Sequence, residues 1–222
     1  MASELKTISD TIKPVLSGLG YRRKGNTFYR ISDGVAYCIA VEHPGLYFAR
    51  FFILPLYTPI EFLYFTYGDR LKIYWDGNGD GTVFISQIID GIYNIIIPFF
   101  QQIDSASQLL AFLQQDHSYV SPYFFCPSFE ISRLAAHTAL MLHNSEAFHR
   151  AVSKTRWQLS VTTSFAHSVI EKIEAELTNL EKIELLPAAE IDQYFQSQTL
   201  QSLQKLFPKY KKQQSVQNTV CK

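Results

Sequence analysis

The stretch GLGYRRKGNTFYR, residues 18–30, decides how the chain begins. It is predicted to contain a helix end, a cationic turn and the start of a strand. Upstream, apolar residues recur in steps of three and four over 5–19, which predicts an amphipathic helix that ends at Gly18 or Gly20. Pro14 interrupts this pattern, and we expect it to kink the helix or to begin a new first turn.

Downstream, residues 27–83 carry the signal of a β-sheet. Aromatic and β-branched residues dominate, and turn signals at Asp33-Gly34 and His43-Pro44-Gly45 separate the runs. The pattern predicts an antiparallel sheet of four or five strands, against which the first helix packs. The expected strands are 28–31, 35–41, 46–54, 71–75 and 82–85.

The rest of the chain is predicted to be helical. Residues 86–103 are very apolar and contain Pro98, which we expect to bend or end a helix. Helical periodicity resumes near Leu134, and a last helix is predicted from Pro187 to about Phe207.

The fold class expected from these patterns is α+β, with an N-terminal helix on an antiparallel sheet and a mostly helical C-terminal half. Aromatic residues support this division, because fifteen lie between Tyr21 and Trp75 and only seven follow residue 130. We expect an α+β domain over 1–120, a helical region packed on or beside it over 121–208, and a disordered tail over 209–222.

The composition bounds the class of protein. With 222 residues, of which 47% are hydrophobic, the chain can bury one substantial core or two small ones. Twenty basic and twenty acidic side chains balance, which makes nucleic acid an unlikely partner. The three cysteines form no CxxC pair, so we expect a reducing cytoplasm. No secretory signal or uninterrupted apolar span is evident, so we expect a soluble protein with no membrane association.

The run LGYRRKGNTFYR (19–30) resembles the opening of a bacterial family, the domain of unknown function 4304 family. Residues 54–59 (LPLYTP) and 68–71 (GDRL) are also similar to members of that family. The resemblance covers roughly the first third of the chain. It implies a small cytosolic α+β protein without assigned catalytic residues, and toxin neutralisation enters only as an analogy with other small binding proteins.

The loop DGNGDGT, residues 76–82, is the best metal candidate in the sequence. Asp76, Asn78, Asp80 and Thr82 present oxygen atoms at alternate positions, as in the first half of an EF-hand calcium loop. The twelfth position is Gln87, where a bidentate Glu is needed. The alternative is a glycine-rich turn without a metal, and this is the interpretation that the pattern favours.

Arg22, Arg23 and Lys24, with Arg30 nearby, form the candidate anion site. Forked guanidinium donors suit phosphate oxygens. The alternative, which we favour, is a solvated turn whose cations lie near the negative end of the first helix.

Catalytic motifs are absent from the sequence: there is no GxSxG, no GxxxxGK[ST], no GxGxxG between a strand and a helix, and no HExxH. We therefore expect no cofactor. His137 and His167 are predicted to be core or boundary residues near apolar helix faces, and Cys38 and Cys126 to be structural thiols.

Function is predicted by class only. The segment between Tyr47 and Tyr67 is rich in tyrosine. Because side chains alternate between the two faces of a strand, some of these tyrosines are expected to be exposed, where they suit a protein interface. The alternative is that they are core tyrosines. The leading hypothesis is a non-enzymatic module that binds another protein. The alternatives are an enzyme whose site is assembled from distant residues and a calcium-stabilised domain. The sequence leaves the partner and the oligomeric state open.

Overall fold

The computed structural model describes residues 2–59, 67–115, 128–162 and 166–208. The chain forms two compact units that alternate along the sequence. The sheet unit contains 2–54 and 67–105, and the helical unit contains 55–59, 106–115, 128–162 and 166–208. The sequence analysis expected a single division near residue 120. The difference arises because 55–59 and 106–115 group with the later helices. The expected tail, 209–222, lies outside the described residues.

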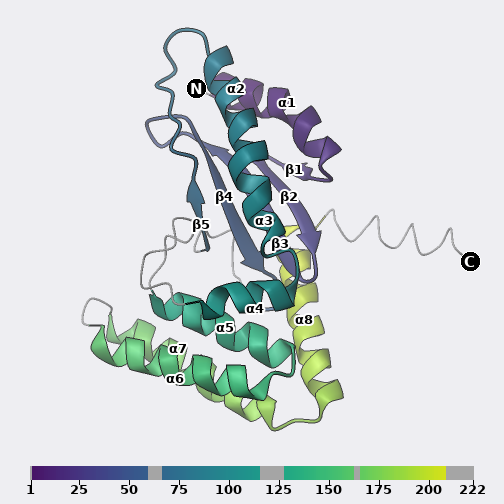
Figure 1. The fold of residues 1–222 in the computed structure, drawn as a ribbon, viewed down its shortest axis with the longest axis vertical. Coiled ribbons are helices and arrows are strands. Elements are labelled where there is room, and N and C mark those ends of the chain that lie inside the picture. The colour runs from purple at the N-terminus through teal and green to yellow at the C-terminus, as the bar shows by residue number, and fades with distance from the viewer. Residues whose placement is uncertain (1, 60–66, 116–127, 163–165, 209–222) are drawn as a thin grey trace, which may run out of the picture. The chain divides into compact units, whose positions relative to one another are not determined.

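The sheet unit is built on a five-stranded antiparallel sheet whose strands lie in sequence order (Figure 1). The turn between its second and third strands contains Asp33 (φ 47°) and Gly34 (φ 73°). Two consecutive positive φ angles give a tight turn that matches the twist of the flanking strands. The predicted hairpin and the α+β fold class are confirmed. The strands are β1 (Arg22–Lys24), β2 (Thr27–Ser32), β3 (Val35–Glu42), β4 (Phe48–Pro55) and β5 (Tyr67–Arg70).

The cationic run is a strand and not the predicted turn. The first helix ends abruptly, since Gly20 has a φ of 82° and the N–H of Tyr21 bonds the carbonyl of Leu16 at 2.9 Å. This helix end leaves Arg22–Lys24 extended as β1, which pairs with β2. The reversal takes place afterwards, at Gly25 (φ 61°).

Two of the five expected strands, 71–75 and 82–85, do not form. Residues 71–75 make one isolated bridge, between Tyr47 and Trp75, and 82–85 form the first turn of a helix. The prediction for 82–85 is wrong because it considered these β-branched and aromatic residues alone. The spacing of the buried residues shows a helix once the residues after 85 are included. Phe84, Ile88 and Ile92 recur every four residues and are all buried, which is the period of a helix face.

Helices cover one face of the sheet (Figure 1). Phe51 of β4 contacts Phe99 and Phe100 at ring-centroid distances of 5.8 and 6.2 Å, and Tyr37 of β3 donates a hydrogen bond to the carbonyl of Ile103. The first of these helices runs through Pro14 as one element. The helical segments of this layer are α1 (Ala2–Gly18), α2 (Thr82–Gly91), the π-helical turn η1 (Ile92–Ile96) and α3 (Ile97–Gln101).

The interruption expected at Pro98 takes the form of a π turn. Proline has no N–H, so the carbonyl four residues earlier loses its usual partner. The wider turn absorbs this loss, and the N–H of Ile97 bonds the carbonyl of Ile92 five residues back. Pro98 therefore does not end the helical segment.

One helical stretch, Thr82–Gln101, is long and apolar enough to cross a membrane by length and composition alone. Its side toward the sheet is covered, because Ile88, Ile96 and Phe99 are buried within the unit. In all, 39% of its most apolar 18-residue window is buried in the structure.

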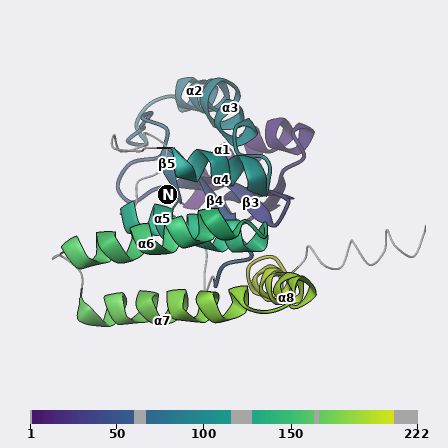
Figure 2. The same ribbon diagram turned by 60° about the horizontal axis from the view of Figure 1, so that its bottom comes forward.

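The helical unit contains α4 (Ala106–Gln114), α5 (Ser128–Met141), α6 (Ser145–Val161), α7 (His167–Glu184) and α8 (Ala188–Leu206). Figure 2 shows α7 below α5 and α6, with α8 seen almost end-on. The side chain of Asn144 caps the start of α6 by accepting from the N–H of Ala147. Tyr57, from the short segment after β4, joins this unit through a 2.8 Å hydrogen bond to Thr138 of α5.

Candidate functional site

The cations of the predicted anion site lie on two faces of the sheet. Strand alternation places Arg23 on the opposite face from Arg22 and Lys24. Arg23 forms an ion pair with Asp10 of α1 and donates to the carbonyl of Gly25 at 2.6 Å. Hydrogen bonds from Lys6 and Arg23 hold the pKa of Asp10 at about 2. Arg23 thus ties α1 to the sheet.

The fourth cation, Arg30, is paired elsewhere. Its guanidinium lies 2.7 Å from Asp104 and over the ring of Tyr37. The structure therefore does not bring the four predicted side chains together around one anion.

The loop of the predicted calcium site is held by its own hydrogen bonds. Asp76 accepts from the backbone and side-chain amides of Asn78, at 2.9 and 3.0 Å. Asp80 accepts from the backbone N–H of Thr82 at 2.9 Å and from its hydroxyl. These bonds lower the pKa of both carboxyl groups. In the described part of the chain, no three His, Cys, Asp or Glu side chains gather as a metal cluster.

An aromatic stack fixes this loop to the end of the sheet. His43, Tyr47, Trp75 and Phe84 follow one another at ring-centroid distances of 4.0, 5.1 and 5.8 Å. The indole N–H of Trp75 donates to the carbonyl of Asn78 at 2.7 Å. A structural explanation for the loop therefore exists without a metal, and the calcium site stays a prediction.

The tyrosines expected at an interface are mostly in the core. Tyr47 and Tyr57 are buried and Tyr67 is half-buried, whereas Tyr64 lies outside the described residues. The expectation of exposed tyrosines fails for Tyr47 and Tyr57 because residues on both faces of β4 and beyond its end are covered.

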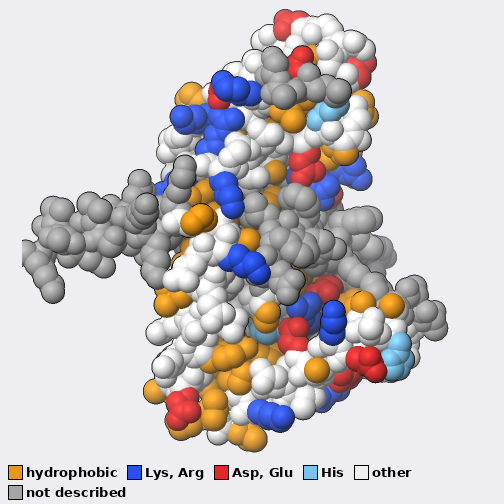
Figure 3. Space-filling view, turned by 180° about the vertical axis from the view of Figure 1, so that it is seen from behind, with side chains coloured by type: hydrophobic (Ala, Val, Ile, Leu, Met, Phe, Trp, Pro, Cys, Tyr) orange, Lys and Arg blue, Asp and Glu red, His pale blue; other side chains and the backbone are white. Residues whose placement is uncertain are grey.

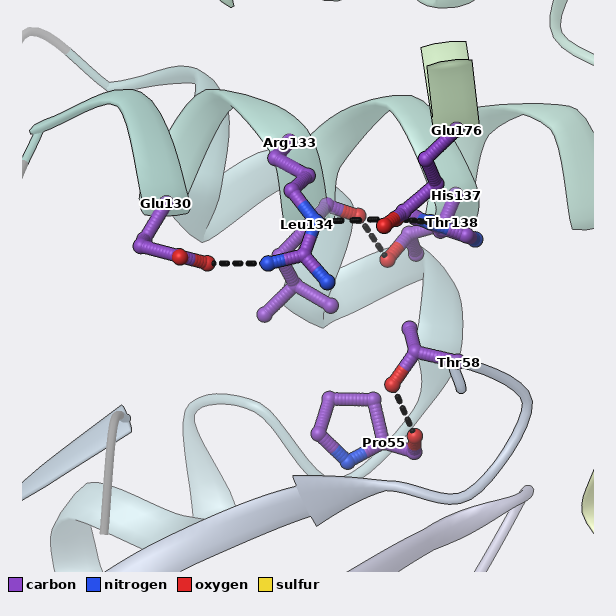
Figure 4. A network of polar contacts seen from close by, with 8 residues as sticks. All are labelled: Pro55, Thr58, Glu130, Arg133, Leu134, His137, Thr138 and Glu176. Atoms are coloured by element: carbon purple, nitrogen blue, oxygen red, sulfur yellow. Dashed lines mark hydrogen bonds and ion pairs between the residues drawn. The ribbon is translucent and has the colours of Figure 1, made fainter. Parts of the chain in front are cut away.

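A partly buried polar network in the helical unit is the best candidate for the alternative of an enzyme (Figure 4). Glu176 of α7 accepts from Nε2 of His137 at 2.5 Å and from Nε of Arg133 at 2.8 Å. A second nitrogen of Arg133 donates to Glu130 at 2.7 Å. His137 is only 1% exposed, which confirms its prediction as a core or boundary residue. The same prediction is wrong for His167, whose side chain is 86% exposed in the first turn of α7.

The electrostatics of this network favour a charged Glu176. Burial by itself raises the pKa of this carboxyl group, but His137 and Arg133 outweigh it and hold the pKa at about 2. Nδ1 of His137 is buried and has no hydrogen-bond partner among the described residues. A histidine oriented by a carboxylate is an arrangement that general bases use. However, the residues that line the cavity described next include none of these side chains.

The helical unit contains an open cavity of about 250 Å³ between α4, α5 and α6. Its wall is mostly apolar, and two cations, Arg150 and Lys154, lie one helical turn apart along its α6 side. The only ion pair of Arg150 in the described structure is an exposed contact of 3.5 Å with Glu146, and Lys154 has none. The other lining residues are Leu113, Gln114, Ser132, Ala135, Ala147 and Ala151.

The outward face of α6 continues past this cavity as an apolar surface. Trp157 is 64% exposed, and Val161, one turn further on, is 59% exposed. Trp157 follows Lys154 by three residues, so the two side chains are neighbours on the helix surface. We call Arg150, Lys154, Trp157 and Val161 the α6 stripe.

The sequence analysis missed this site. A usable signal was present, because Arg150, Lys154, Trp157 and Val161 are spaced by four, three and four residues. This spacing places a large aromatic side chain on the polar face of an amphipathic helix, where solvent exposure is expected.

Comparison with known proteins adds no relative: no family model, curated protein or solved structure matches the chain. The resemblance to the domain of unknown function 4304 family therefore stays a prediction.

Proposed function

We propose that this protein is a non-enzymatic module that binds another protein through the α6 stripe of its helical unit. The observation that carries the proposal is the exposed Trp157 beside a cavity with a cationic rim. Tryptophan and arginine are among the residues most enriched at the positions that dominate binding energy at interfaces.

Three features support a binding surface over an incidental exposed side chain. Trp157 and Val161 form adjoining apolar area one helical turn apart. The adjacent cavity is large enough to receive a side chain from a partner. Arg150 and Lys154 leave their charge available, since Arg150 makes only a weak exposed pair with Glu146.

Exposed apolar side chains also occur elsewhere on the helical unit. Figure 3 shows hydrophobic side chains gathered at the turn between α7 and α8, where Leu185 is 81% exposed. Leu185 does not line the cavity between α4, α5 and α6. Leu185 therefore serves as the matched control for Trp157.

The proposal places the protein in the cytoplasm, which the sparse cysteines and the buried, unpaired thiol of Cys38 support. A toxin as the partner rests only on the analogy with other small binding proteins.

Affinity capture from the native cell lysate tests the proposal, with wild type, Trp157→Ala and Leu185→Ala compared by quantitative mass spectrometry. We expect one protein at near-equal stoichiometry with wild type and Leu185→Ala, and at least tenfold less with Trp157→Ala. A partner captured equally by all three chains, or no enriched partner, contradicts the proposal.

A further inference from the structure

We infer that the cavity between α4, α5 and α6 recognises an acidic peptide segment of the partner that inserts one aliphatic side chain. This inference rests on the proposed function and specifies the chemistry of the same site. It follows from the volume of the cavity, the polarity of its wall and the charge at its rim.

The volume suits one side chain and little more. A cavity of roughly 150 Å³ holds a benzene-sized group. About 250 Å³ therefore accommodates a leucine-sized side chain with part of its backbone. The cavity therefore takes a single anchor, which an extended or helical peptide segment can present.

The wall selects an apolar anchor. Leu113, Ala135, Ala147 and Ala151 supply carbon surface. The one hydroxyl group in the wall, that of Ser132, donates to the side-chain oxygen of Gln158 at 2.8 Å. A polar anchor placed against this wall would therefore lose hydration without gaining the Ser132 hydroxyl as a donor.

The rim selects negative charge beside the anchor. Both charged side chains of the lining, Arg150 and Lys154, are cations, and none is a carboxylate. Glu146 lies near Arg150, but their side chains are 82% and 67% exposed and 3.5 Å apart, a geometry that contributes little. A carboxylate from a partner can therefore replace this contact at small cost.

The direct test uses synthetic peptides with both ends capped: a central leucine flanked by two aspartates, the same peptide with asparagines, and the same peptide with lysines. Binding is followed by amide chemical shifts of Ser132, Ala147 and Ala151 in the full-length protein. At 50 mM salt we expect the aspartate peptide to bind several-fold more tightly than the asparagine peptide. Raising the salt to 0.5 M should weaken the binding of the aspartate peptide several-fold.

Two variants separate charge from cavity filling. Lys154→Glu, on the exposed rim, should reverse the preference toward the lysine peptide, and Lys172→Glu on the exposed face of α7 is the matched control that should change nothing. Ala151→Leu fills the cavity and should abolish the shift changes for every peptide. If Ala151→Leu lowers the melting temperature markedly, the inference is judged only by whether Lys154→Glu reverses the peptide preference.

Several outcomes overturn the inference: equal binding of the aspartate and asparagine peptides, unchanged binding to Ala151→Leu that folds as wild type does, or no binding of any peptide at millimolar concentration. Tighter binding of free hexanoate than of the aspartate peptide would assign the cavity to a small acid instead. The proposed function fails separately, when Trp157→Ala retains the captured partner. A partner that is lost with Trp157→Ala but is indifferent to Lys154→Glu refutes this inference alone.

Discussion

At the scale of single residues, Glu176 is the centre of the polar packing in the helical unit. It holds His137 and Arg133 of α5 against α7. A buried charge that loses its partner is expensive, because the remaining charge is neither hydrated nor paired. The network therefore fixes how α5 and α7 pack, whether or not it has a chemical function.

We expect Glu176→Gln to destabilise the helical unit by about 3 kcal/mol at pH 7. The pKa of Glu176 is lowered from 4.5 to about 2 in the folded protein, so its contribution is fully present above pH 4.5 and is lost as the pH falls toward 2. The difference in unfolding free energy between wild type and Glu176→Gln should therefore shrink toward zero as the pH falls from 4.5 toward 2.

Urea denaturation at pH 7 and at pH 3, followed by Trp157 fluorescence in a Trp75→Phe background, measures this difference in unfolding free energy. Glu171→Gln, on an exposed part of α7, is the control and should change the unfolding free energy by less than about 0.5 kcal/mol. A difference for Glu176→Gln that is the same at both pH values would contradict the charged network.

The loop 76–82 gives a second prediction for a single residue. Asp80 accepts from the N–H of Thr82 at the start of α2, so Asp80→Ala should lower the melting temperature by a few degrees with or without calcium. If the loop binds calcium, wild type gains stability on calcium addition and Asp80→Ala does not. Differential scanning calorimetry with calcium and with EDTA separates the two effects, and an equal rise in both chains rules out a site at Asp80.

At the scale of elements, close approach of backbones decides where β5 can pair. A Cβ atom at Gly68 of β5 would lie 2.1 Å from the carbonyl oxygen of Phe51 and 2.5 Å from Cα of Phe52. Both atoms belong to the backbone of β4, so they cannot move aside without breaking the strand pair. Only glycine fits this position.

We expect Gly68→Ala to destabilise the sheet unit by more than about 2 kcal/mol. Gly18→Ala is the matched control, since a Cβ atom at this last residue of α1 meets no atom within 4 Å. Alanine there should be neutral or stabilising by up to about 1 kcal/mol. Thermal denaturation compares them, and similar melting temperatures for the two variants would contradict the strand contact.

At the scale of the whole molecule, the two units share the sequence in alternating segments. Strand β4 belongs to the sheet unit as far as Leu54, and its last residue, Pro55, and the residues after it belong to the helical unit. Within the helical unit, Tyr57 is fixed by its hydrogen bond to Thr138 of α5 and its ring contact with Phe195 of α8.

The chain offers one tryptophan in each unit as a reporter, Trp75 and Trp157. We expect Tyr57→Ala to destabilise the helical unit by about 3–5 kcal/mol, as for other buried aromatic residues. In a Trp75→Phe background, the denaturation midpoint reported by Trp157 should fall when Tyr57→Ala is added. An unchanged midpoint would contradict the assignment of Tyr57 to the helical unit.

Much of the fold was predictable where a local pattern is sufficient. Strand alternation and the Asp33-Gly34 turn identified the β2–β3 hairpin, and the stripe over 5–19 identified α1. Segments near 71–85 were mispredicted because their residues suit a strand locally, whereas contacts with distant residues made them a bridge and a helix. The α6 stripe was not predicted, because an exposed tryptophan has no sequence signature apart from its place on a helix face.

The sequence by itself determined the α+β class, the antiparallel order of the early strands and the helical character of the second half, because periodicity and turn chemistry act between near neighbours in the chain. Only the tertiary structure decided that Tyr57 packs with α5 and α8, that His137 and Arg133 meet Glu176, and that α4, α5 and α6 leave a cavity beside Lys154. These features depend on side chains far apart in sequence, whose meeting is set by how complete helices pack and not by any local preference.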